Sequence, residues 1–334
     1  MNSNTYNLRA YNTFQVEATA SRFSRFTSVT QLKKLIKSDN LRKFILGGGS
    51  NVLFTKHMHA HVLLNEIESI KIIKETPTYA YVRVGAGINW HEFVLWSLEN
   101  KFSGLENLSL IPGKVGAAPI QNIGAYGVEQ KDLFDSLEAV DLQSAKSIKF
   151  DKKECAFGYR ESIFKNECRL KYCITSVEYR LNKRFKANIS YGAINQQLEE
   201  SGIDKPTAKD LSDVIIKIRS SKLPDPSELG NAGSFFKNPI IPIDQFNKLK
   251  KVYADLPSYP VDKATCKVPA GWLIERCGWK GKKVGDVSCY HKQALVIVNH
   301  GEKDGSKIRQ HALNVKKSVF NKYGIHLQNE VNIF

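Results

Sequence analysis

The sequence has 334 residues and a formal net charge of +16, with 42% hydrophobic and 25% charged residues, proportions typical of a globular protein of two or three domains. It contains no apolar run long enough to span a membrane and no secretory signal at its start, so we expect a cytoplasmic protein with no membrane contact. The basic charge is compatible with nucleic acid or with an anionic substrate. The basic residues are spread along the chain without a zinc finger or RNA-recognition signature, so we expect no nucleic-acid partner.

Residues 30–46 predict a short amphipathic helix followed by a strand that ends at GGGSN (47–51). The backbone amides of GGGSN could form an anion nest for a phosphate, although the spacing of a Walker loop is absent. Taken alone, such a glycine turn is more often structural.

The histidines of HMHAH (57–61) alternate, so in a strand they would share one face. With no carboxylate or cysteine nearby in sequence, we interpret the stretch as a solvated hairpin edge rather than a metal site. The six cysteines form no CxxC pair, which indicates reduced thiols rather than disulfides or zinc ligands. We therefore expect no metal.

Residues 79–104 repeat the strand–helix order, which favours an α/β or α+β layer structure. GAGINW (85–90) begins like a dinucleotide fingerprint, but Trp90 stands where the third glycine belongs, so we reject a Rossmann site. The following segment, 105–127, has almost no charge and neither helical nor strand periodicity. A long segment of this kind inside a compact domain is usually functional.

Two or three strands are predicted between 136 and 182, and FGYRES (157–162) lies between them. Arg160 in this motif could bind a carboxylate in a bidentate manner, although an Arg beside a Glu is usually a surface pair. Residues 206–226 predict a helix that begins with a capping pattern at Thr207 and ends at two prolines. We place a domain boundary near residue 220.

The last third predicts two helices, a strand, a long helix and a final strand over 325–334. Glu330 falls on the polar face of that final strand, which by default faces solvent. In GNAGSFFKNP (230–239), Ser234 follows a glycine-rich turn and precedes two phenylalanines. A structural turn is the simpler interpretation, and no GxSxG elbow supports Ser234 as a nucleophile.

Together these motifs are more specific. In one order the chain carries ILGGGSN (45–51), IPGKVGAAPIQNIGAYG (111–127), FGYRES (157–162), KLPDP (222–226), GNAGSFFKNP (230–239), AGWLIE (270–275) and NEV (329–331). This set closely resembles the UDP-N-acetylenolpyruvoylglucosamine reductase (MurB) family of bacterial peptidoglycan synthesis, from NTF at 12–14 through Glu330. ISYG at 189–192 resembles the type I form, in which a tyrosine loop folds over the substrate.

The resemblance implies an α+β fold with a FAD-binding two-domain module of the vanillyl-alcohol-oxidase class and a C-terminal α+β substrate-binding domain. The expected divisions are 1–70 with 321–334, 71–219, and 220–320. It also implies non-covalent FAD, because neither flavin segment contains His or Cys, with NADPH as co-substrate and a monomeric state. The cofactor-binding residues carried over by motif are Gly47, Gly48, Gly49, Ser50, Asn51, Pro112, Gly113, Gln121, Asn122, Gly124, Ala125, Tyr126 and Arg219.

The family reaction passes a hydride from NADPH through FAD to C3 of the enolpyruvyl group and a proton to C2. By resemblance, Arg160 and Glu330 stabilise the enolate and Ser234 donates the proton. The expected substrate-binding residues are Tyr191, Lys222, Asn238, Tyr259, Lys267 and Gln293. Another FAD-linked oxidoreductase of the same superfamily remains the alternative, although an oxidase should lack the trio of Arg160, Ser234 and Glu330.

Overall fold

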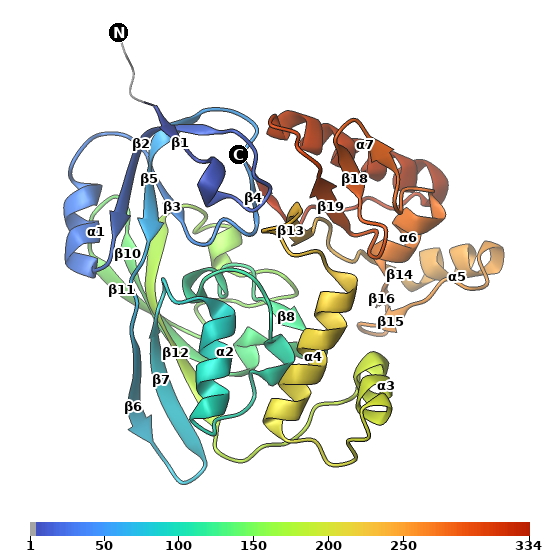
Figure 1. Ribbon diagram of the computed structural model, residues 1–334, viewed down its shortest axis with the longest axis horizontal. Coiled ribbons are helices and arrows are strands. Elements are labelled where there is room, and N and C mark those ends of the chain that lie inside the picture. The colour runs from blue at the N-terminus through green and yellow to red at the C-terminus, as the bar shows by residue number, and fades with distance from the viewer. Residues whose placement is uncertain (1–4) are drawn as a thin grey trace. The chain divides into compact units, whose positions relative to one another are not determined.

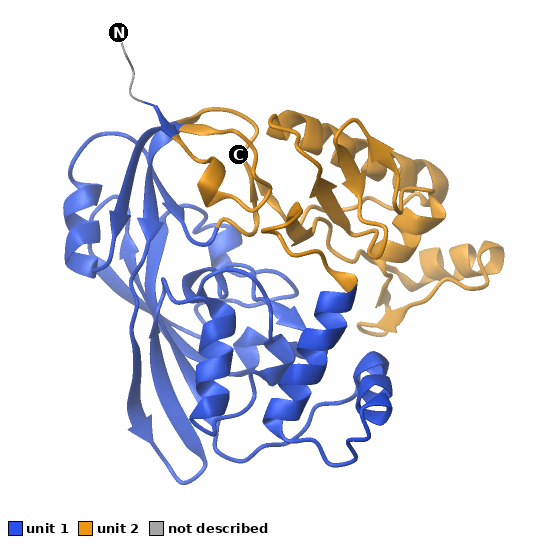
Figure 2. Ribbon diagram, in the orientation of Figure 1, with its two compact units in different colours: residues 1–6, 20–48, 59–221 blue, residues 7–19, 49–58, 222–334 orange. Residues whose placement is uncertain are grey.

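The computed structural model describes residues 5–334, which fall into two compact units (Figure 2). Of the described residues, unit 1 holds 5–6, 20–48 and 59–221. Unit 2 holds residues 7–19, 49–58 and 222–334. Neither unit is continuous in sequence, so each is built by pairing of distant segments.

The main sheet of unit 1 has five strands in the order β11-β10-β12-β7-β6 (Figure 1). Every neighbouring pair is antiparallel. The strands are β6 (Ile70–Glu75), β7 (Tyr79–Gly85), β10 (Phe134–Asp141), β11 (Ser147–Asp151) and β12 (Tyr172–Asn182). Of the two or three strands predicted between 136 and 182, three are present, namely β10, β11 and β12. Antiparallel pairing makes the fold α+β rather than doubly wound α/β.

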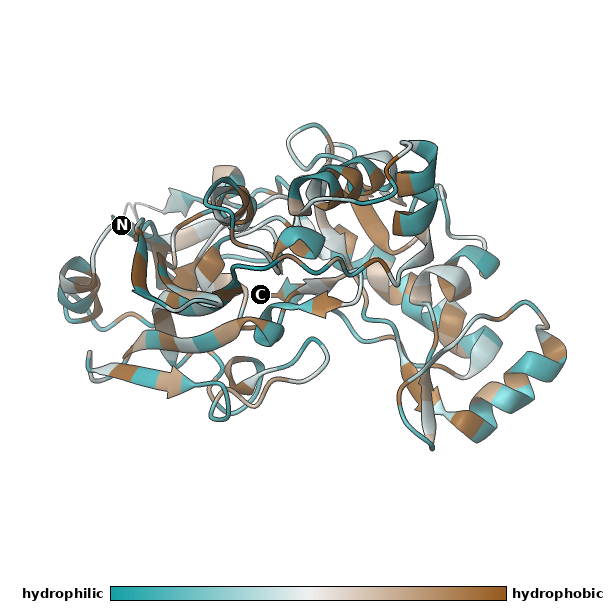
Figure 3. Ribbon diagram, turned by 90° about the horizontal axis from the view of Figure 1, so that it is seen from below, coloured by the Kyte–Doolittle hydropathy of each residue, from teal (hydrophilic) through white to brown (hydrophobic). Residues whose placement is uncertain are grey.

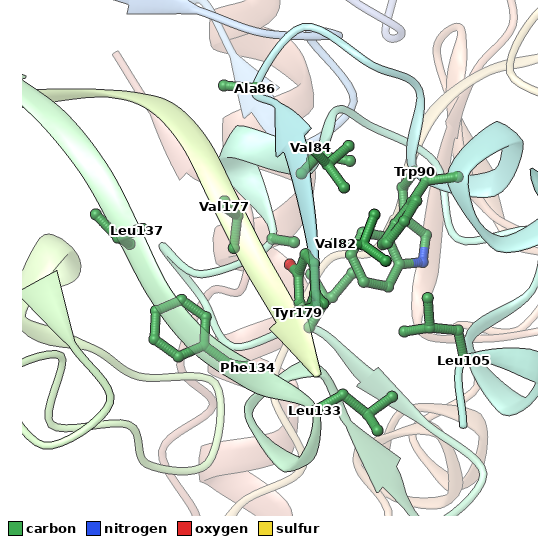
Figure 4. Close-up of a cluster of buried hydrophobic side chains, with 14 of the residues drawn as sticks. Val82, Val84, Ala86, Trp90, Leu105, Leu133, Phe134, Leu137, Val177 and Tyr179 are labelled. Atoms are coloured by element: carbon green, nitrogen blue, oxygen red, sulfur yellow. The ribbon is translucent and has the colours of Figure 1, made fainter. Parts of the chain in front are cut away.

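The core of this unit lies between the five-stranded sheet and helix α2 (Trp90–Glu99). Asn89 caps α2 by accepting hydrogen bonds from the amides of His91 and Glu92. With β7 before it, α2 confirms the strand–helix order predicted for 79–104. Figure 4 shows Trp90 beside Tyr179 of β12, and their ring centroids are 5.8 Å apart. The Trp90 indole donates to the Leu108 carbonyl at 3.0 Å, so this buried polar group is satisfied.

A second sheet has the order β1-β2-β5-β3. Its strands are β1 (Tyr6–Asn7), β2 (Thr19–Phe26), β3 (Lys43–Leu46) and β5 (Met58–Asn65). Helix α1 (Val29–Ile36) begins at Ser28, whose side chain accepts from the Gln31 amide. The helix and strand predicted within 30–46 are thus confirmed, and β3 pairs in parallel with β5.

Two helices complete unit 1, α3 (Gly192–Glu200) and α4 (Ala208–Lys222). The predicted capping pattern is present, because the Asp210 amide donates to the Thr207 hydroxyl and the Asp210 carboxylate accepts from the Thr207 amide. The apolar faces of the two helices form one cluster that includes Ile194 and Ile215.

Unit 2 contains an antiparallel sheet of four strands, in the order β13-β19-β18-β17. The strands are β13 (Gly230–Ser234), β17 (Lys283–Val284), β18 (Val287–Cys289) and β19 (Val296–Asn299). Helix α7 (Gly305–Tyr323) lies against β18, β19 and helix α6 (Ala270–Arg276). Asp304 caps the start of α7, and Gly324 ends it in the left-handed conformation.

A smaller sheet of unit 2 has the order β14-β16-β15. It consists of β14 (Ile240–Pro242), β15 (Tyr259–Pro260) and β16 (Thr265–Lys267). Helix α5 (Ile243–Val252) follows β14, and hydrophobic and hydrophilic residues alternate along it in Figure 3.

The prediction of a final strand over residues 325–334 is mostly wrong. Only β20 (Asn332–Ile333) is a strand, paired in parallel with β4 (Val52–Leu53). The predicted alternation survives without a strand ladder, because Ile325, Leu327 and Val331 are buried in an extended segment. Glu330 is half-buried rather than on a face open to solvent.

The interpretation of HMHAH as a solvated hairpin edge is wrong for His61. This residue lies in β5, an interior strand of its sheet, and its side chain is fully buried. Its Nδ1 lies 2.8 Å from the Asp39 carboxylate and its Nε2 lies 2.8 Å from the Ser24 hydroxyl. Burial lowers the pKa of His61 against the opposing effect of Asp39. His61 is therefore a structural histidine.

Within the described chain, residues 5–334, no cluster of His, Cys, Asp or Glu could hold a metal ion, and no helix is long and apolar enough to cross a membrane. All six cysteines are free thiols. The three-part domain division expected from the sequence stays a prediction.

Candidate active site

The glycine turn that follows β3 is held by close backbone contacts. A Cβ on Gly48 would lie 3.3 Å from the Gly113 Cα, which is tight packing of two glycine backbones within unit 1. Gly49 has φ +65°, and a Cβ there would lie 2.1 Å from the Tyr11 carbonyl oxygen within unit 2. The turn therefore needs glycine for both conformation and space.

The segment 112–118, in which Lys114 is the one charged residue, is held by hydrogen bonds against the connection between β7 and α2. The Gly113 carbonyl accepts from the Trp90 amide, and the Val115 amide donates to Ile88, both within unit 1. A Cβ on Gly116 would lie 2.5 Å from the Ala86 Cβ. The lack of side chains thus lets the segment run closely along the sheet, and its short helix η3 (Val115–Ala117) replaces any longer element.

Asn122 is buried, and its side chain hydrogen-bonds with three other parts of the chain. Its amide nitrogen donates to the Glu129 carboxylate and to the Gly158 carbonyl, both at 2.9 Å. Its side-chain oxygen accepts from the Lys131 amide at 3.2 Å. Both amide hydrogens are therefore committed inside the protein, so a contact from Asn122 to a cofactor would have to use its backbone.

Arg160 contacts the same segment from a tight turn, which is closed by a bridge between Gly158 and Glu161. Its φ of +54° is left-handed, a conformation that costs a non-glycine residue free energy. Its guanidinium donates to the carbonyl oxygens of Gly124 and Asn122. A Cβ on Gly124 would lie 2.9 Å from the Arg160 Nη1, so glycine at 124 is needed for the guanidinium to lie against the strand β8 (Gly124–Ala125).

Tyr126, Tyr191 and Arg219 come together in unit 1. The rings of Tyr126 and Tyr191 meet edge to face with centroids 5.2 Å apart, and Tyr191 is 45% exposed. Arg219 donates to the Leu110 carbonyl at 3.3 Å and hydrogen-bonds with Tyr126. Burial lowers the pKa of Arg219 but does not approach deprotonation of a guanidinium. The Arg219 cation is thus held beside the Tyr126 phenol, whose ring in turn contacts Tyr191.

Ser234 lies at the end of β13, directly after a β-bulge. In the pairing of β13 with β19, Asn231 lies opposite Val298 and Ser234 lies opposite Val296, so β13 contains one extra residue. Gly233 in the left-handed conformation makes this bulge possible. A bulge re-aims the side chains that follow it, so Ser234 ends the strand half-buried while Phe235 and Phe236 enter the core.

Glu330 lies beside this strand end in unit 2. Its amide donates to the Phe235 carbonyl at 2.8 Å, and the Lys237 amide donates to Gln328 at 2.9 Å. The Asn51 side chain donates to the Glu330 carbonyl at 3.3 Å. The structure therefore brings Ser234, Glu330 and Asn51 to neighbouring backbone positions, although they lie far apart in sequence.

The other predicted substrate-binding residues of unit 2 form two groups. Asn238 accepts from the Ala270 amide at the start of α6, and a Cβ on Gly271 would lie 3.1 Å from the Gln293 side chain. Tyr259 and Lys267 are direct cross-strand partners, so their side chains share one face of the small sheet. Lys222 is exposed at the end of α4, and Pro112 is also exposed, whereas Ser50, Gln121 and Ala125 are half-buried.

Sequence reasoning missed two polar residues of unit 1. Glu129 lies 3.7 Å from the Arg160 guanidinium, and its position directly after the uncharged segment was the available signal. Asn107 is buried, and its side chain donates to the carbonyls of Tyr126 and Asn188 at 3.0 Å each. No sequence pattern marks Asn107, because it acts through contacts distant in sequence.

Comparison with known proteins is consistent over the whole chain. A family model described as "FAD binding domain" matches residues 23–149, and one described as "UDP-N-acetylenolpyruvoylglucosamine reductase, C-terminal domain" matches residues 225–334. The UDP-N-acetylenolpyruvoylglucosamine reductase of Flavobacterium johnsoniae is 49% identical over 98% of both chains. That of Burkholderia ambifaria is 46% identical over 97% of this chain and 94% of its own.

The fold is also that of a solved structure. The crystal structure of the reductase MurB from Thermus caldophilus aligns with a TM-score of 0.68, at 21% identity and over 99% of both chains. This likeness and the family matches confirm the expected α+β fold, which has a FAD-binding module and a separate C-terminal domain. Because nearly half of its positions are identical to these relatives along almost its full length, the chain belongs to the family of the UDP-N-acetylenolpyruvoylglucosamine reductases.

Proposed function

We propose that the chain reduces UDP-N-acetylenolpyruvoylglucosamine to UDP-N-acetylmuramate, with FAD as bound cofactor and NADPH as co-substrate. The observation that carries this proposal is the 49% identity with a named reductase over 98% of both chains. The reaction is a step of peptidoglycan synthesis. We propose that the enzyme works in the cytoplasm as a monomer.

The residues of the glycine turn and of segment 112–126 fit FAD. The backbones of Gly48 and Gly113 approach closely, and the Lys114 side chain lies 3.6 Å from the position of a Cβ on Gly47. Backbone amides of a glycine turn are suitable donors to a diphosphate, and the lysine adds a positive charge beside them. FAD, when bound, supplies transfer of a hydride from NADPH to C3 of the enolpyruvyl group. With no His or Cys in either segment, we propose that it is held without a covalent bond. The residues proposed to hold it are Gly47, Gly48, Gly49, Ser50, Asn51, Pro112, Gly113, Gln121, Asn122, Gly124, Ala125, Tyr126 and Arg219.

Three side chains of this chain are proposed to manage the charge and the proton of the substrate. Addition of hydride at C3 leaves negative charge at C2 and its carboxylate, which a cation stabilises. We assign this role to Arg160, assisted by Glu330 as a general acid. Ser234 donates its proton to C2. A serine hydroxyl is a weak acid in water, but the bulge and the buried Phe235 and Phe236 hold it in preorganised, apolar surroundings.

The sugar nucleotide is proposed to contact residues of both sequence halves. Two tyrosines offer aromatic surface, and two lysines offer charge to its phosphates. The proposed substrate-binding residues are Tyr191, Lys222, Asn238, Tyr259, Lys267 and Gln293.

Anaerobic stopped-flow measurement of flavin absorbance tests the assignment of Ser234. Reduction by NADPH should proceed at the wild-type rate in Ser234→Ala, because no substrate proton moves in that half-reaction. Reoxidation by the enolpyruvyl substrate should slow by a factor of roughly 10²–10⁴, the usual contribution of a positioned acid. Ser234→Cys should recover part of the rate, because a thiol also carries a proton.

If both half-reactions slow equally, Ser234 only shapes its turn. If the wild-type flavin is reoxidised by oxygen but not by the enolpyruvyl sugar nucleotide, the chain is instead another FAD-linked oxidoreductase.

A further inference from the structure

The carboxylate of Glu129 contacts three polar side chains within unit 1, in addition to the Asp132 amide of its capping box. Glu129 ends the short strand β9 (Val128–Glu129), and its side chain is 23% exposed. One carboxylate oxygen lies 3.7 Å from the Arg160 Nη1. The other accepts from the Asn122 amide at 2.9 Å and lies 2.8 Å from the Lys131 ammonium. Glu129 is thus an anion placed directly against the guanidinium of Arg160.

A second path from Glu129 reaches the backbone of the Arg160 turn. The Asn122 nitrogen that donates to Glu129 also donates to the Gly158 carbonyl, and Gly158 closes the turn with Glu161. Within that turn Arg160 has the unfavourable φ of +54°. Such a conformation persists only where surrounding contacts hold it. The contact with Glu129 and the Asn122 bridge therefore restrain both ends of one side chain.

The negative charge of Glu129 is the one property that glutamine, a side chain of the same shape, would not provide. A free arginine side chain samples many rotamers, and fixing it costs conformational entropy. The carbonyls of Gly124 and Asn122 accept hydrogen bonds from the guanidinium. The Glu129 carboxylate adds Coulomb attraction to the guanidinium across 3.7 Å, which a neutral side chain would not supply. The cation is consequently oriented before any negative charge develops on a substrate.

We propose that Glu129 is a positioning residue for the reaction, which acts by orienting the guanidinium of Arg160 toward the developing enolate. This inference rests on the role proposed above for Arg160. Glu129 itself needs no contact with the substrate.

The chain offers a matched pair of variants for the test. Glu129 and Asp132 form a reciprocal capping box at the start of the helix η4 (Gln130–Asp132), and Asp132 accepts from the Glu129 amide at 2.9 Å. Glu129→Gln keeps the shape, the cap and an acceptor for Asn122 but removes the charge beside Arg160. Asp132→Asn makes the same chemical change in the same capping box, on a carboxylate that accepts a hydrogen bond from the Glu129 amide.

Both half-reactions of the FAD-loaded variants are measured by anaerobic stopped flow. In Glu129→Gln, reoxidation by the enolpyruvyl substrate should slow roughly tenfold to a hundredfold, by analogy with the loss caused by removing a partner that orients a metal ligand. Reduction by NADPH, flavin content and the thermal unfolding midpoint should match the wild type. Asp132→Asn should leave both half-reactions unchanged, and Glu129→Asp should restore part of the lost rate.

A double-mutant cycle with Arg160→Lys separates the inference from the proposed function. If Arg160→Lys leaves reoxidation unchanged, the role assigned to Arg160 is wrong. If Arg160→Lys slows reoxidation but Glu129→Gln does not, Glu129 is not a positioning residue. The inference is also overturned if the two effects simply multiply, because residues that act through one another are non-additive. Equal slowing of both half-reactions by Glu129→Gln would indicate a structural role and overturn it as well.

Discussion

Acid should destabilise unit 2 through the buried His311. This residue lies on α7 and is 3% exposed. Its Nε2 contacts the Cys289 Sγ at 3.7 Å, and its Nδ1 has no hydrogen-bond partner among residues 5–334. Burial, with a smaller effect of Lys282, lowers the pKa of His311 from 6.5 to about 4. The folded protein therefore holds the neutral imidazole where the unfolded chain would bind a proton.

The sign and size of the effect follow from this difference. Because the folded pKa is the lower one, the stabilisation is fully present above pH 6.5 and is lost as the pH falls toward about 4. At 1.36 kcal/mol per pKa unit, the whole loss is about 3 kcal/mol, of which about 2 kcal/mol is lost by pH 5. That is a large fraction of the 5–15 kcal/mol that stabilises a typical domain.

Urea unfolding of the FAD-loaded protein between pH 7.5 and 4.5 measures this contribution. His311→Leu removes the titrating group, so its stability should fall less with acid than that of the wild type, with the two curves converging by about 2 kcal/mol at pH 5. The comparison cancels other titrating groups, including the buried His61. The ring of Trp279 lies 5.1 Å from the His311 ring, so native fluorescence should show no quenching step above pH 5. Parallel stability curves, or a quenching step near pH 6.5, would refute the reasoning.

Two further substitutions test the proposed site. Tyr191→Ala should weaken substrate affinity by roughly 1–3 kcal/mol through lost stacking and hydrogen bonding without changing flavin content, and an unchanged Michaelis constant for the enolpyruvyl substrate would rule out contact with Tyr191. Gly49→Ala should lower the free energy of unfolding by at least about 2 kcal/mol, because it combines φ +65° with a Cβ 2.1 Å from the Tyr11 oxygen. An unfolding midpoint equal to that of the wild type would show that the turn relaxes freely.

The local elements were largely predictable because their signals are local. Capping residues mark the starts of α2 and α4, and apolar periodicity marks β7, β12 and the helices that follow glycine turns or precede prolines. The final segment failed because alternating burial fits any extended chain, whereas a strand also needs a partner edge. Only residues 332–333 form a strand ladder, on β4, and Asn329 makes a single bridge to Phe236.

The burial of His61 was also not predictable from the local sequence. The alternation of the three histidines of HMHAH was interpreted as an exposed hairpin edge, but β5 pairs with β2 and β3 on its two sides. Burial of the imidazole then depends on Asp39 and Ser24, which lie 22 and 37 residues away in sequence. No local pattern specifies such partners.

The sequence by itself determined the family, and with it the cofactor and the reaction, because long ordered motifs such as GNAGSFFKNP and the uncharged segment 111–127 have little freedom to occur by chance. Only the tertiary structure decided how single side chains are held. The bulge that re-aims Ser234 depends on the register of β13 against β19, and the contact of Glu129 with Arg160 joins a strand end to a turn 31 residues further along the chain. Register and such long-range contacts arise from packing of the whole unit, so the sequence does not display them locally.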